Sequence, residues 1–331
     1  MILLAHPFGN ANVRALLDAL QRDGLLAKYF TTLGWPNKSP FGLLPRRGYD
    51  LPSSKIEARP LREVARLLAG ALQLRKLIEH ERGWASIDAV WRDLDRRAAR
   101  YLCANKRHEQ IDSVYAYEDC ALELFEAAND LHVRRIYDLP IAYWETAQRL
   151  LKEEARRYPA WEPTLGGTRD SEAKLARKSR ELELAELVIC PSNFVLDSLP
   201  TGTRAAKPCV VVPFGSPSAP SAERDPKRGS GKLRVLFAGA LTQRKGLADL
   251  FAAMKLIRSP HVELIVMGSL LRPLEWYREQ CDFTYEPPRP HAEVLRLMQT
   301  CDVFVLPSIV EGRALVQQEA MACGLALIAT K

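Results

Sequence analysis

The sequence lacks the short motifs that mark several common classes of protein. Its 331 residues contain no Walker A loop, no Gly-x-Ser-x-Gly elbow and no Gly-x-Gly-x-x-Gly run. The seven cysteines form no Cys-x-x-Cys pair, and no His/Cys cluster has the spacing of a zinc site. Most of them lie in apolar stretches, which predicts buried thiols in a reducing compartment. These absences argue against P-loop, serine-hydrolase, dinucleotide-oxidoreductase and zinc chemistry.

A long uninterrupted apolar run is also missing. The opening MILLAHPFG is shorter than a signal peptide and has no basic segment before it. We therefore expect neither a secretory signal nor a membrane span, and a cytoplasmic location. A hydrophobic content of 47% with 26% charged residues is typical of a soluble globular protein, and the chain is long enough for two domains.

Charge is plentiful but unevenly spread, with a formal net charge of +7. Cationic side chains crowd the N-terminal half, at Arg96, Arg97, Arg100, Lys106, Arg107, Arg134, Arg135, Arg156 and Arg157. A solvated helix face of mixed sign explains each run taken alone. Their sum predicts peripheral attraction to an anionic membrane, at its inner face. No nucleic-acid-binding module accompanies this charge, so we expect no nucleic-acid partner.

The most informative stretch is residues 302–330, DVFVLPSIVEGRALVQQEAMACGLALIAT. A buried-strand run over 303–306 leads to a turn with Glu311, then to a helical segment with Glu319, then to a second apolar strand. A helix N-terminus offers unpaired N–H groups and the positive end of a dipole, which suit phosphate. The Glu-x7-Glu spacing puts the second carboxylate about two turns inside the helix. Carboxylates bind vicinal hydroxyls, so the stretch predicts a site for a sugar nucleotide, although dipole complementation also explains such glutamates.

A second loop suited to phosphate lies upstream, in residues 233–246, LRVLFAGALTQRKG. A strand ends at Gly239, and the basic pair Arg244-Lys245 stands before Gly246 and a helix. A small residue at a strand end lets a ligand approach the backbone, and adjacent cations can neutralise a diphosphate. A lone basic pair is more often a solvated turn, but two such loops on one α/β unit favour a binding site.

Strand and helix patterns alternate along the chain, which predicts an α/β fold with two Rossmann-like domains. We expect helices over 13–26, 61–82 and 86–102, and strands over 2–5, 112–117, 133–137, 187–190, 234–238, 262–267, 302–306 and 325–329. A segment rich in Pro, Ser and Gly over 216–232 indicates a loop near a hinge. The first domain is therefore placed over 1–212 and the second over 213–331.

One short motif inside the predicted helix over 86–102 is misleading. Asp93-Leu94-Asp95 has the form of an Asp-x-Asp metal-binding motif. Side chains at positions i and i+2 of a helix diverge by roughly 200°. These two carboxylates therefore cannot hold one ion together, and we predict no metal site.

Four segments, found together and in order, resemble the retaining two-domain glycosyltransferases of the GT-B type, glycosyltransferase family 4 (group 1). They are ELAELVICPSNFV (183–195), VVVPFG (210–215), FAGALTQRKG (237–246) and PSIVEGRALVQQEAMACGLALIAT (307–330). The resemblance covers the chain from about Lys178 onward. It implies two Rossmann-like domains facing a cleft, the first for the acceptor and the second for the donor. The implied reaction is transfer of a sugar from a nucleoside diphosphate to an acceptor hydroxyl with retained configuration, as in polysaccharide biosynthesis.

The resemblance assigns roles in the second domain. Arg244 and Lys245 would contact the donor diphosphate, Glu311 would face the transferred sugar, and Glu319 would hold the ribose. The first three form the implied catalytic set. The other donor-binding positions are Gly239, Gly312, Arg313 and Ala314, the last two standing where many relatives have an aromatic residue and Gly. The resemblance implies no cofactor beyond the donor and no divalent metal.

Acceptor candidates follow the strands of the first domain. Gly9, Asn10 and Asn12 come after the first strand, and Tyr117 and Glu118 end a later one, where family members often place a His. The carboxyl ends of parallel strands are where open α/β sheets bind ligands. The acceptor itself, whether a saccharide, a lipid-linked group or a small molecule, is not indicated by these residues.

Two alternatives to sugar transfer remain open, and the first follows from where the chain ends. Lys331 comes directly after a strand that the family follows with further elements, so we expect the second domain to be truncated at its C-terminus. A truncated chain could bind a nucleotide sugar without transferring it. A nucleotide-sugar epimerase of GT-B fold is the other alternative.

Overall fold

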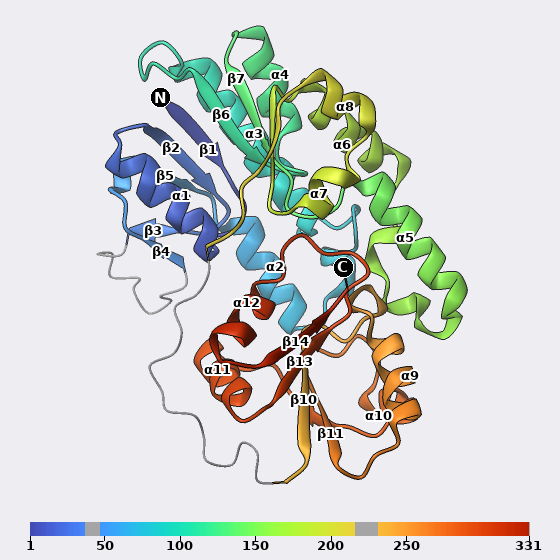
Figure 1. Ribbon diagram of the computed structural model, residues 1–331. Helices are drawn as coiled ribbons and strands as arrows, with labels where there is room; N and C mark the ends of the chain where they lie inside the picture. Colours follow the sequence, from blue (N-terminus) through green and yellow to red (C-terminus); the bar gives the residue numbers. More distant parts are fainter. Residues whose placement is uncertain (37–46, 216–230, 331) are drawn as a thin grey trace. The chain divides into compact units, whose positions relative to one another are not determined.

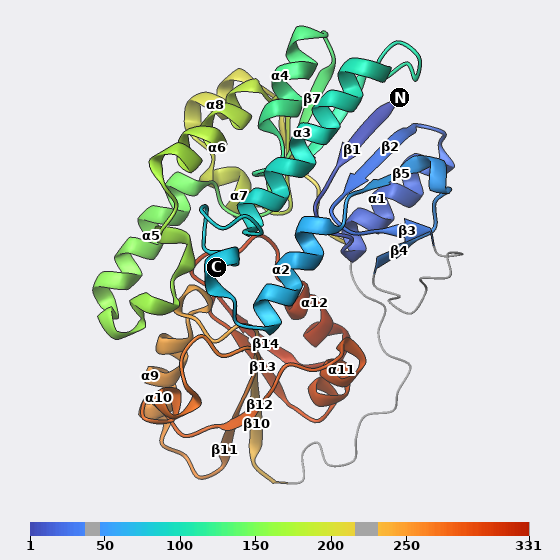
Figure 2. The same ribbon diagram turned by 180° about the vertical axis from the view of Figure 1, so that it is seen from behind.

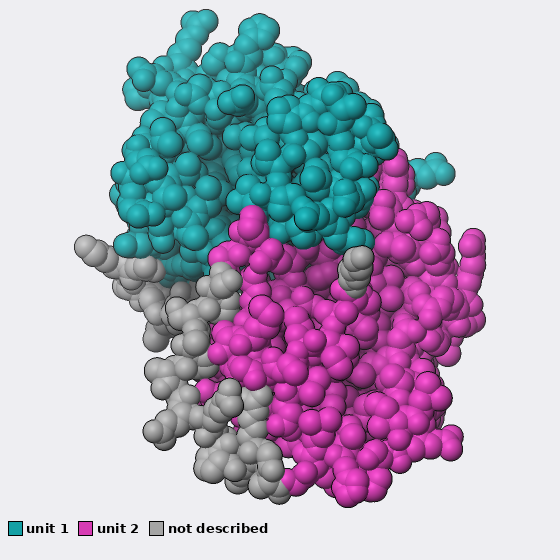
Figure 3. Space-filling view, viewed as in Figure 1, with its two compact units in different colours: residues 1–140, 171–212 teal, residues 141–170, 213–331 magenta. Residues whose placement is uncertain are grey.

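The computed structural model describes residues 1–36, 47–215 and 231–330 and forms two compact units, coloured separately in Figure 3. Unit 1 comprises Met1–Pro140 and Ser171–Val212, and unit 2 comprises Ile141–Asp170 and Pro213–Lys331. The chain passes from unit 1 to unit 2 for the last time between Val212 and Pro213, which is the predicted domain boundary. The prediction of a continuous first domain over 1–212 is wrong for residues 141–170, which belong to unit 2.

Unit 1 is built on a seven-stranded parallel sheet in the order β5-β2-β1-β6-β7-β8-β9 (Figure 1). The strands are β1 (Ile2–Ala5), β2 (Leu26–Thr31), β5 (Ile56–Ala58), β6 (Ser113–Tyr117), β7 (Arg134–Asp138), β8 (Leu187–Cys190) and β9 (Cys209–Val211). The strand order runs outward in both directions from the pair β1 and β6. This reversal is the topological switch point at which doubly wound sheets bind ligands. A separate short pair, β3 (Trp35–Pro36) and β4 (Gly48–Tyr49), lies beside this sheet.

Helices cover both faces of the unit 1 sheet because successive strand residues point to opposite faces. The helices are α1 (Ala11–Arg22), α2 (Leu61–Ala71), α3 (Ile87–Asn105), α4 (Leu122–Asp130), α6 (Glu172–Leu184), α7 (Asn193–Ser198) and α8 (Thr201–Ala206). Leu4 and Tyr29 pack with Val13 of α1, whereas Phe30 contacts Tyr101 of α3. Helices α3, α4 and α6 lie side by side, as Figure 2 shows from behind.

Unit 2 has a five-stranded parallel sheet in the order β12-β11-β10-β13-β14. Its strands are β10 (Leu233–Ala238), β11 (Val262–Met267), β12 (Thr284–Glu286), β13 (Val303–Leu306) and β14 (Ala326–Ala329), and its helices are α5 (Trp144–Arg157), α9 (Leu247–Ile257), α10 (Leu274–Arg278), α11 (His291–Gln299) and α12 (Leu315–Ala322). The central strands are fully buried at Leu236, Ile265 and Phe304. The edge strand β14 is exposed, including Leu327 and Ile328. The switch point lies between β10 and β13.

Residues 141–170 belong to unit 2 because they contribute to its core. Trp161 is 4% exposed, and its ring centroid lies 4.8 Å from that of Trp276 and 5.8 Å from that of Phe251. A buried tryptophan is worth several kcal/mol to the element that it packs against. The helical pattern of this segment does not show which of two sheets it covers, so sequence order alone assigned it to the first.

Most predicted elements are present, with differences at their ends. The helix expected over 13–26 ends at Arg22, because Gly24 adopts φ +67° and the chain turns into β2. The helix expected over 61–82 ends at Ala71. Strands β2, β3, β4, β5, β9 and β12 were not predicted. The loop predicted over 216–232 falls, for residues 216–230, outside the described residues.

Candidate functional site

Close contacts between backbone segments shape the carboxyl ends of the central strands in unit 2. Gly268, after β11, has φ +146°, and a Cβ there would lie 1.8 Å from the carbonyl oxygen of Gly239, after β10. Gly246 has φ +71°, and a Cβ there would lie 1.9 Å from the carbonyl oxygen of Pro307, after β13. Only glycine fits these positions. The loop of residues 239–246 is therefore held directly against the end of β13, and two segments far apart in sequence form one site.

Lys245 and Glu311 form the centre of this site. The Lys245 Nζ donates a hydrogen bond to Glu311 Oε2, and the Lys245 side chain is largely buried. Burial lowers the pKa of Lys245, and the Glu311 carboxylate acts in the opposite direction. Ser308 Oγ lies 3.4 Å from the same carboxylate oxygen. The sequence predicted both residues as catalytic, and the structure brings them into direct contact.

Arg244 links the two loops through both its backbone and its side chain. Its carbonyl oxygen accepts the N–H of Ile309 at 2.9 Å, and its Nη1 donates to the Val310 carbonyl oxygen at 2.9 Å. The same Nη1 lies 3.9 Å from Glu311 Oε2. The guanidinium therefore adds positive charge beside Lys245, and one of its N–H groups fixes the loop.

A group of buried polar residues that was not predicted from the sequence forms hydrogen bonds with the loop of residues 239–246. Gln243 is fully buried, and its side-chain N–H groups donate to Glu154 at 2.6 Å and Asp249 at 2.8 Å. Thr164 accepts the Gln243 N–H at 3.1 Å, and its carbonyl oxygen accepts the Thr242 hydroxyl at 2.6 Å. Glu154 and Thr164 lie in the 141–170 segment. That segment therefore positions the loop that carries Arg244 and Lys245, which no local sequence pattern indicates.

Helix α12 presents its N-terminus on the β13 side of the site. Ala314 precedes the first helical residue and supplies no side-chain cap, so the first N–H groups of the helix have no capping side chain. The Gly312 N–H lies 3.3 Å from the Glu311 carboxylate. The Arg313 guanidinium lies against the Gln318 amide, with its Nε and Nη2 at 2.8 Å and 2.7 Å from the amide oxygen in the orientation that satisfies both groups.

Glu319 lies closer to the start of α12 than the sequence suggested. The helix begins at Leu315, so Glu319 is its fifth residue and lies little more than one turn inside, instead of two. Its Oε1 lies 2.9 Å from His291 Nε2, on α11. The carboxylate is therefore oriented by a partner from a different helix, which the spacing of the glutamates does not reveal.

Together these groups can bind a phosphorylated ligand. Lys245, Arg244 and the N-terminus of α12 can stabilise the negative charge of a phosphate. The carboxylates of Glu311 and Glu319 can accept hydrogen bonds from hydroxyl groups. Gly239 lets a ligand approach the β10 backbone. Arg313 and Ala314 lie at the same helix end, with Arg313 engaged by Gln318.

The acceptor candidates after β1 of unit 1 have mainly local roles. Asn10 caps α1, with its Oδ1 accepting the Val13 N–H at 3.0 Å. Asn12 is half-buried within α1. Gly9 passes so close to Tyr49 that a Cβ would lie 2.1 Å from its hydroxyl oxygen. These residues shape the loop at the switch point of unit 1, and their contact with an acceptor stays a prediction.

Tyr117, at the end of β6, belongs to a group that includes a residue the sequence analysis did not single out. Its ring centroid lies 4.4 Å from that of His6 and 5.8 Å from that of Trp91. Burial lowers the pKa of His6 to about 3, so its imidazole is neutral near pH 7. Its Nε2 lies 3.8 Å from Asp138 Oδ2, and burial raises the pKa of Asp138 to about 7. These groups meet at the carboxyl ends of β1, β6 and β7.

Glu118 lies nearby but is held by cations. The side chain is buried, and its Oε1 lies 3.1 Å from Lys178 Nζ, which also lies 3.2 Å from Asp119 Oδ2. Burial raises the pKa of Glu118, and Lys178 opposes this effect. The ion pair gives Glu118 a structural role, and its contact with an acceptor stays a prediction.

Asp138 predicts a pH-dependent stability. Its folded pKa of about 7 lies above the ordinary value of 3.8, so the folded state holds a proton that the unfolded state has lost between these limits. Stability therefore falls as pH rises through this window. Asp138→Asn removes the titration and should raise the free energy of unfolding at pH 8 by on the order of 1–4 kcal/mol, with little change at pH 4. Urea unfolding at both pH values measures this, and a variant that is less stable than the parent at pH 8 would contradict it.

Comparisons with known proteins bear on the same part of the chain. Residues 232–331 match the family described as Glycosyl transferases group 1. The D-inositol 3-phosphate glycosyltransferase of Arthrobacter sp. (strain FB24) is 34% identical over 114 residues, which cover 31% of this chain and 27% of that protein. The match thus spans little more than a quarter of the relative's length.

Solved structures resemble the whole chain. Sucrose-phosphate synthase from Thermosynechococcus elongatus has a TM-score of 0.62 at 18% identity, with 99% of this chain and 80% of that chain covered. The Anabaena protein HepE, in complex with UDP and glucose, has a TM-score of 0.56 at 17% identity, with 100% and 80% covered. At such identities the likeness concerns the fold. The chain therefore has the GT-B fold, and its residues 232–331 match the glycosyl transferases group 1 family.

Proposed function

We propose that the protein is a glycosyltransferase that moves a sugar from a nucleoside-diphosphate sugar to an acceptor hydroxyl with retention of configuration. The observation that carries the proposal is the contact between Lys245 and Glu311, made at the switch point of the unit 2 sheet by two loops. The contact supports the proposal because a cation suited to a diphosphate lies next to a carboxylate suited to a sugar. The family match over residues 232–331 supports the same reaction class.

The leaving diphosphate is the group that needs most stabilisation. Negative charge develops on it as the glycosidic bond breaks, and positive groups fixed in advance lower that barrier without reorganising. Lys245, Arg244 and the N–H groups at the start of α12 supply this charge. The Lys245–Thr242–Thr164 connections hold the loop in place. This is electrostatic catalysis, and no covalent intermediate with the protein is required.

The hydroxyl groups of the donor are assigned to the two glutamates. Glu311 would orient the transferred sugar, because its carboxylate is fixed by Lys245. Glu319 would bind the ribose, with His291 holding the carboxylate from the other side. The structure of HepE, which has a similar fold, contains UDP and glucose. Sugars linked to uridine or guanosine diphosphate are therefore the donors to test first.

The acceptor would bind to unit 1, at the carboxyl ends of β1 and β6. His6, Tyr117 and Asp138 gather there, and parallel sheets bind ligands at such a switch point. A neutral imidazole can accept a proton from a hydroxyl, although burial weakens His6 as a base. The protein would act in the cytoplasm.

The proposal is tested by combining nucleotide binding with product analysis. Glu319→Gln should weaken UDP binding by roughly tenfold in calorimetry, because one charge-assisted hydrogen bond is lost, and should leave pyrophosphate binding unchanged. Glu275→Gln, at an exposed position of α10, is the matched control. Equal loss for both ligands would remove Glu319 from the ribose site.

Product analysis separates transfer from its alternatives. Release of UDP from UDP-glucose that depends on an added acceptor, with an α-linked product by NMR, would support retaining transfer. An isomerised sugar formed without acceptor would identify an epimerase instead. Tight binding of nucleotide sugar with no product over a broad acceptor panel would favour a non-catalytic binding protein.

A further inference from the structure

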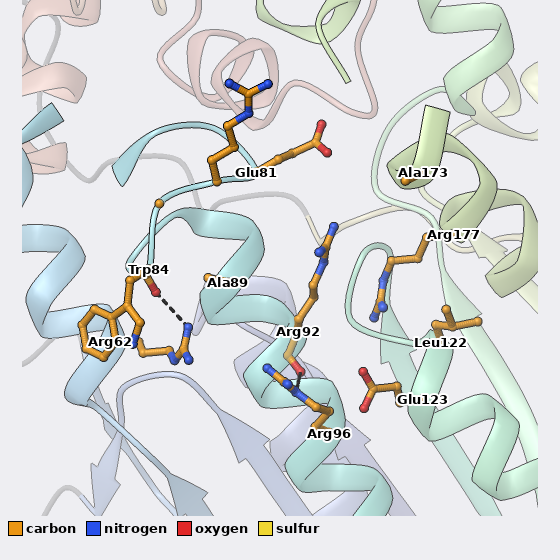
Figure 4. A pocket seen from close by; sticks show the side chains of 12 residues that line it. Arg62, Glu81, Trp84, Ala89, Arg92, Arg96, Leu122, Glu123, Ala173 and Arg177 are labelled. Atoms are coloured by element: carbon orange, nitrogen blue, oxygen red, sulfur yellow. Dashed lines mark hydrogen bonds between the residues drawn. The ribbon is translucent and has the colours of Figure 1, made fainter. Parts of the chain in front are cut away.

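Four helices of unit 1 enclose a pocket of about 580 Å³ (Figure 4). The residues that line it come from α2, α3, α4, α6 and the loop of residues 81–84, and all of them belong to unit 1. No helix among residues 1–36, 47–215 and 231–330 is long and apolar enough to cross a membrane. The volume of the pocket lies within the range of sites that bind small molecules.

Arginine supplies most of the charge in this pocket. The cationic residues that line it are Arg62, Arg82, Arg92, Arg96 and Arg177, and the acidic ones are Glu81 and Glu123. The cations outnumber the carboxylates, and a concave surface concentrates the field of the charges that line it. The pocket is therefore positive and suited to an anion.

Two of these arginines already have acidic partners. Arg177 pairs with Asp95, and its Nε lies 3.2 Å from Glu181. Arg82 Nη1 lies 3.7 Å from Glu79. These two guanidinium groups help to build the walls of the pocket, so the charge that a ligand could neutralise belongs to the other three arginines.

Those three arginines, Arg62, Arg92 and Arg96, make contacts only with neutral groups. In the described part of the chain, none of them forms an ion pair with a carboxylate. Arg62 donates to the Trp84 carbonyl oxygen at 2.8 Å, and Arg96 donates to the Arg92 carbonyl oxygen at 3.2 Å (Figure 4). A carbonyl acceptor leaves the positive charge uncompensated. Guanidinium groups in this condition suit carboxylate, sulfate or phosphate oxygens, which they can bind in pairs.

Trp84 adds an aromatic surface beside the arginines. It is 48% exposed, and the Arg62 guanidinium lies 5.0 Å from the centroid of its ring. The same two residues also line a second hollow of about 180 Å³, together with Arg59 and Leu61. The pocket and the second hollow therefore adjoin at Arg62 and Trp84.

The pocket is separate from the acceptor candidates of unit 1. Ala89 and Arg92 line it from one stripe of α3. Trp91, on the same helix, packs instead against Phe8 and Tyr117, with ring centroids 5.5 Å and 5.8 Å away. Trp91 is rotated around the helix by roughly 100° from Arg92 and roughly 200° from Ala89. The carboxyl ends of β1 and β6 and the pocket thus lie against different sides of α3.

The two kinds of side chain together favour an acidic sugar chain. The face of an aromatic ring carries partial negative charge, so it attracts the C–H groups on the face of a sugar ring, while guanidinium groups bind acidic substituents. A simple inorganic anion would leave Trp84 and the second hollow unused. A neutral sugar would leave the three arginines uncompensated.

We propose that the pocket and the hollow beside it bind an acidic oligosaccharide. Its carboxylate, sulfate or phosphate groups would pair with Arg62, Arg92 and Arg96, and one of its rings would pack against Trp84. An oligosaccharide of several units would extend into the second hollow. This site goes beyond the proposed sugar transfer, because it lies away from the acceptor candidates and needs no donor.

Calorimetry with tetragalacturonate, which carries a carboxylate on each sugar, tests the proposal in the absence of donor. The methyl-esterified tetramer keeps the sugar chain but has no charge, so it should bind at least about tenfold more weakly. Arg92→Gln/Arg96→Gln should lower the affinity for tetragalacturonate by at least about tenfold. Trp84→Ala should lower it by roughly threefold to tenfold. Circular dichroism checks that each variant is folded.

Matched controls remove the same groups elsewhere in unit 1. Arg107→Gln/Arg134→Gln changes two exposed arginines, and Phe194→Ala removes an aromatic ring from a residue that is 39% exposed. Both controls should bind tetragalacturonate like the parent. Losses equal to those of the pocket variants would show unspecific attraction to a basic protein and would overturn the proposal.

The parent protein alone can also overturn the proposal, whatever the variants do. Equal affinity for tetragalacturonate and its methyl ester would show that the arginines do not hold acidic groups. Sulfate binding as tight as that of tetragalacturonate, with neither affinity changed by Trp84→Ala, would assign the pocket to a simple anion. Absence of sugar transfer in product analysis would contradict the proposed function and leave a positive binding result in place.

Discussion

Replacing Lys245 by Met is expected to weaken binding of UDP or GDP by about tenfold to a hundredfold. A charge-assisted hydrogen bond contributes about 1.5–3 kcal/mol, which corresponds to this range. The effect should lie toward its upper end, because removing the cation leaves Glu311 unneutralised beside the diphosphate. Isothermal calorimetry measures the change. Replacing Arg244 as well should weaken binding further, but by a smaller factor than Lys245→Met does. The reason is that the Arg244 guanidinium already donates to the Val310 carbonyl oxygen.

The matched control is Lys255→Met, at an exposed position of α9 in the same unit. It removes the same charge from unit 2 and should leave nucleotide affinity unchanged. If Lys245→Met bound UDP as tightly as the parent while remaining folded, the diphosphate site would have to lie elsewhere.

Asp95→Ala is expected to destabilise unit 1 by about 3–5 kcal/mol. The side chain is fully buried, and its carboxylate accepts the N–H groups of Glu123 and Leu124 at 2.9 Å each. It also pairs with Arg177. Removing it leaves the Glu123 and Leu124 N–H groups of α4 without their acceptor and a buried guanidinium with fewer partners. The residue that resembles half of a metal-binding Asp-x-Asp is therefore a structural cap.

Urea unfolding and hydrogen exchange at the α4 amides measure this effect. Glu183→Ala serves as control, because Glu183 forms an arginine ion pair of 3.0 Å in the same unit but is 63% exposed. Its loss should cost about 0–1 kcal/mol. Similar losses for both variants would mean that the buried cap contributes no more than a surface ion pair.

The strands of unit 2 could be predicted almost to the residue. β11 has the predicted bounds, and β10, β13 and β14 differ by one residue at their start. Parallel strands read as continuous apolar runs, which are easy to recognise, and this holds here for the buried strands and for the exposed edge strand β14. The contact between Lys245 and Glu311 also agrees with two loops expected to belong together. Short edge strands such as β12 carry no such run and were missed.

Packing between distant segments could not be predicted. The apolar spacing of α2 is visible in the sequence. The direction in which its apolar face points depends on the ion pairs that Glu63 forms with Arg66 and Arg47. The support of the 239–246 loop by Thr164 depends on which sheet a helix covers. His291 reaches Glu319 from another helix. Each is a tertiary contact, and local spacing holds no information about it.

The insertion of Trp161 into the core of unit 2 has a consequence for synthesis of the chain. Its neighbours Phe251, Trp276 and Tyr277 leave the ribosome 90 to 116 residues later. At about 5–20 residues per second, this delay is on the order of ten seconds. During that interval a nascent chain that has completed unit 1 still carries a large aromatic side chain without its pocket. Part of unit 2 is therefore synthesised before unit 1 is complete, and residues 141–170 wait for the rest of their core.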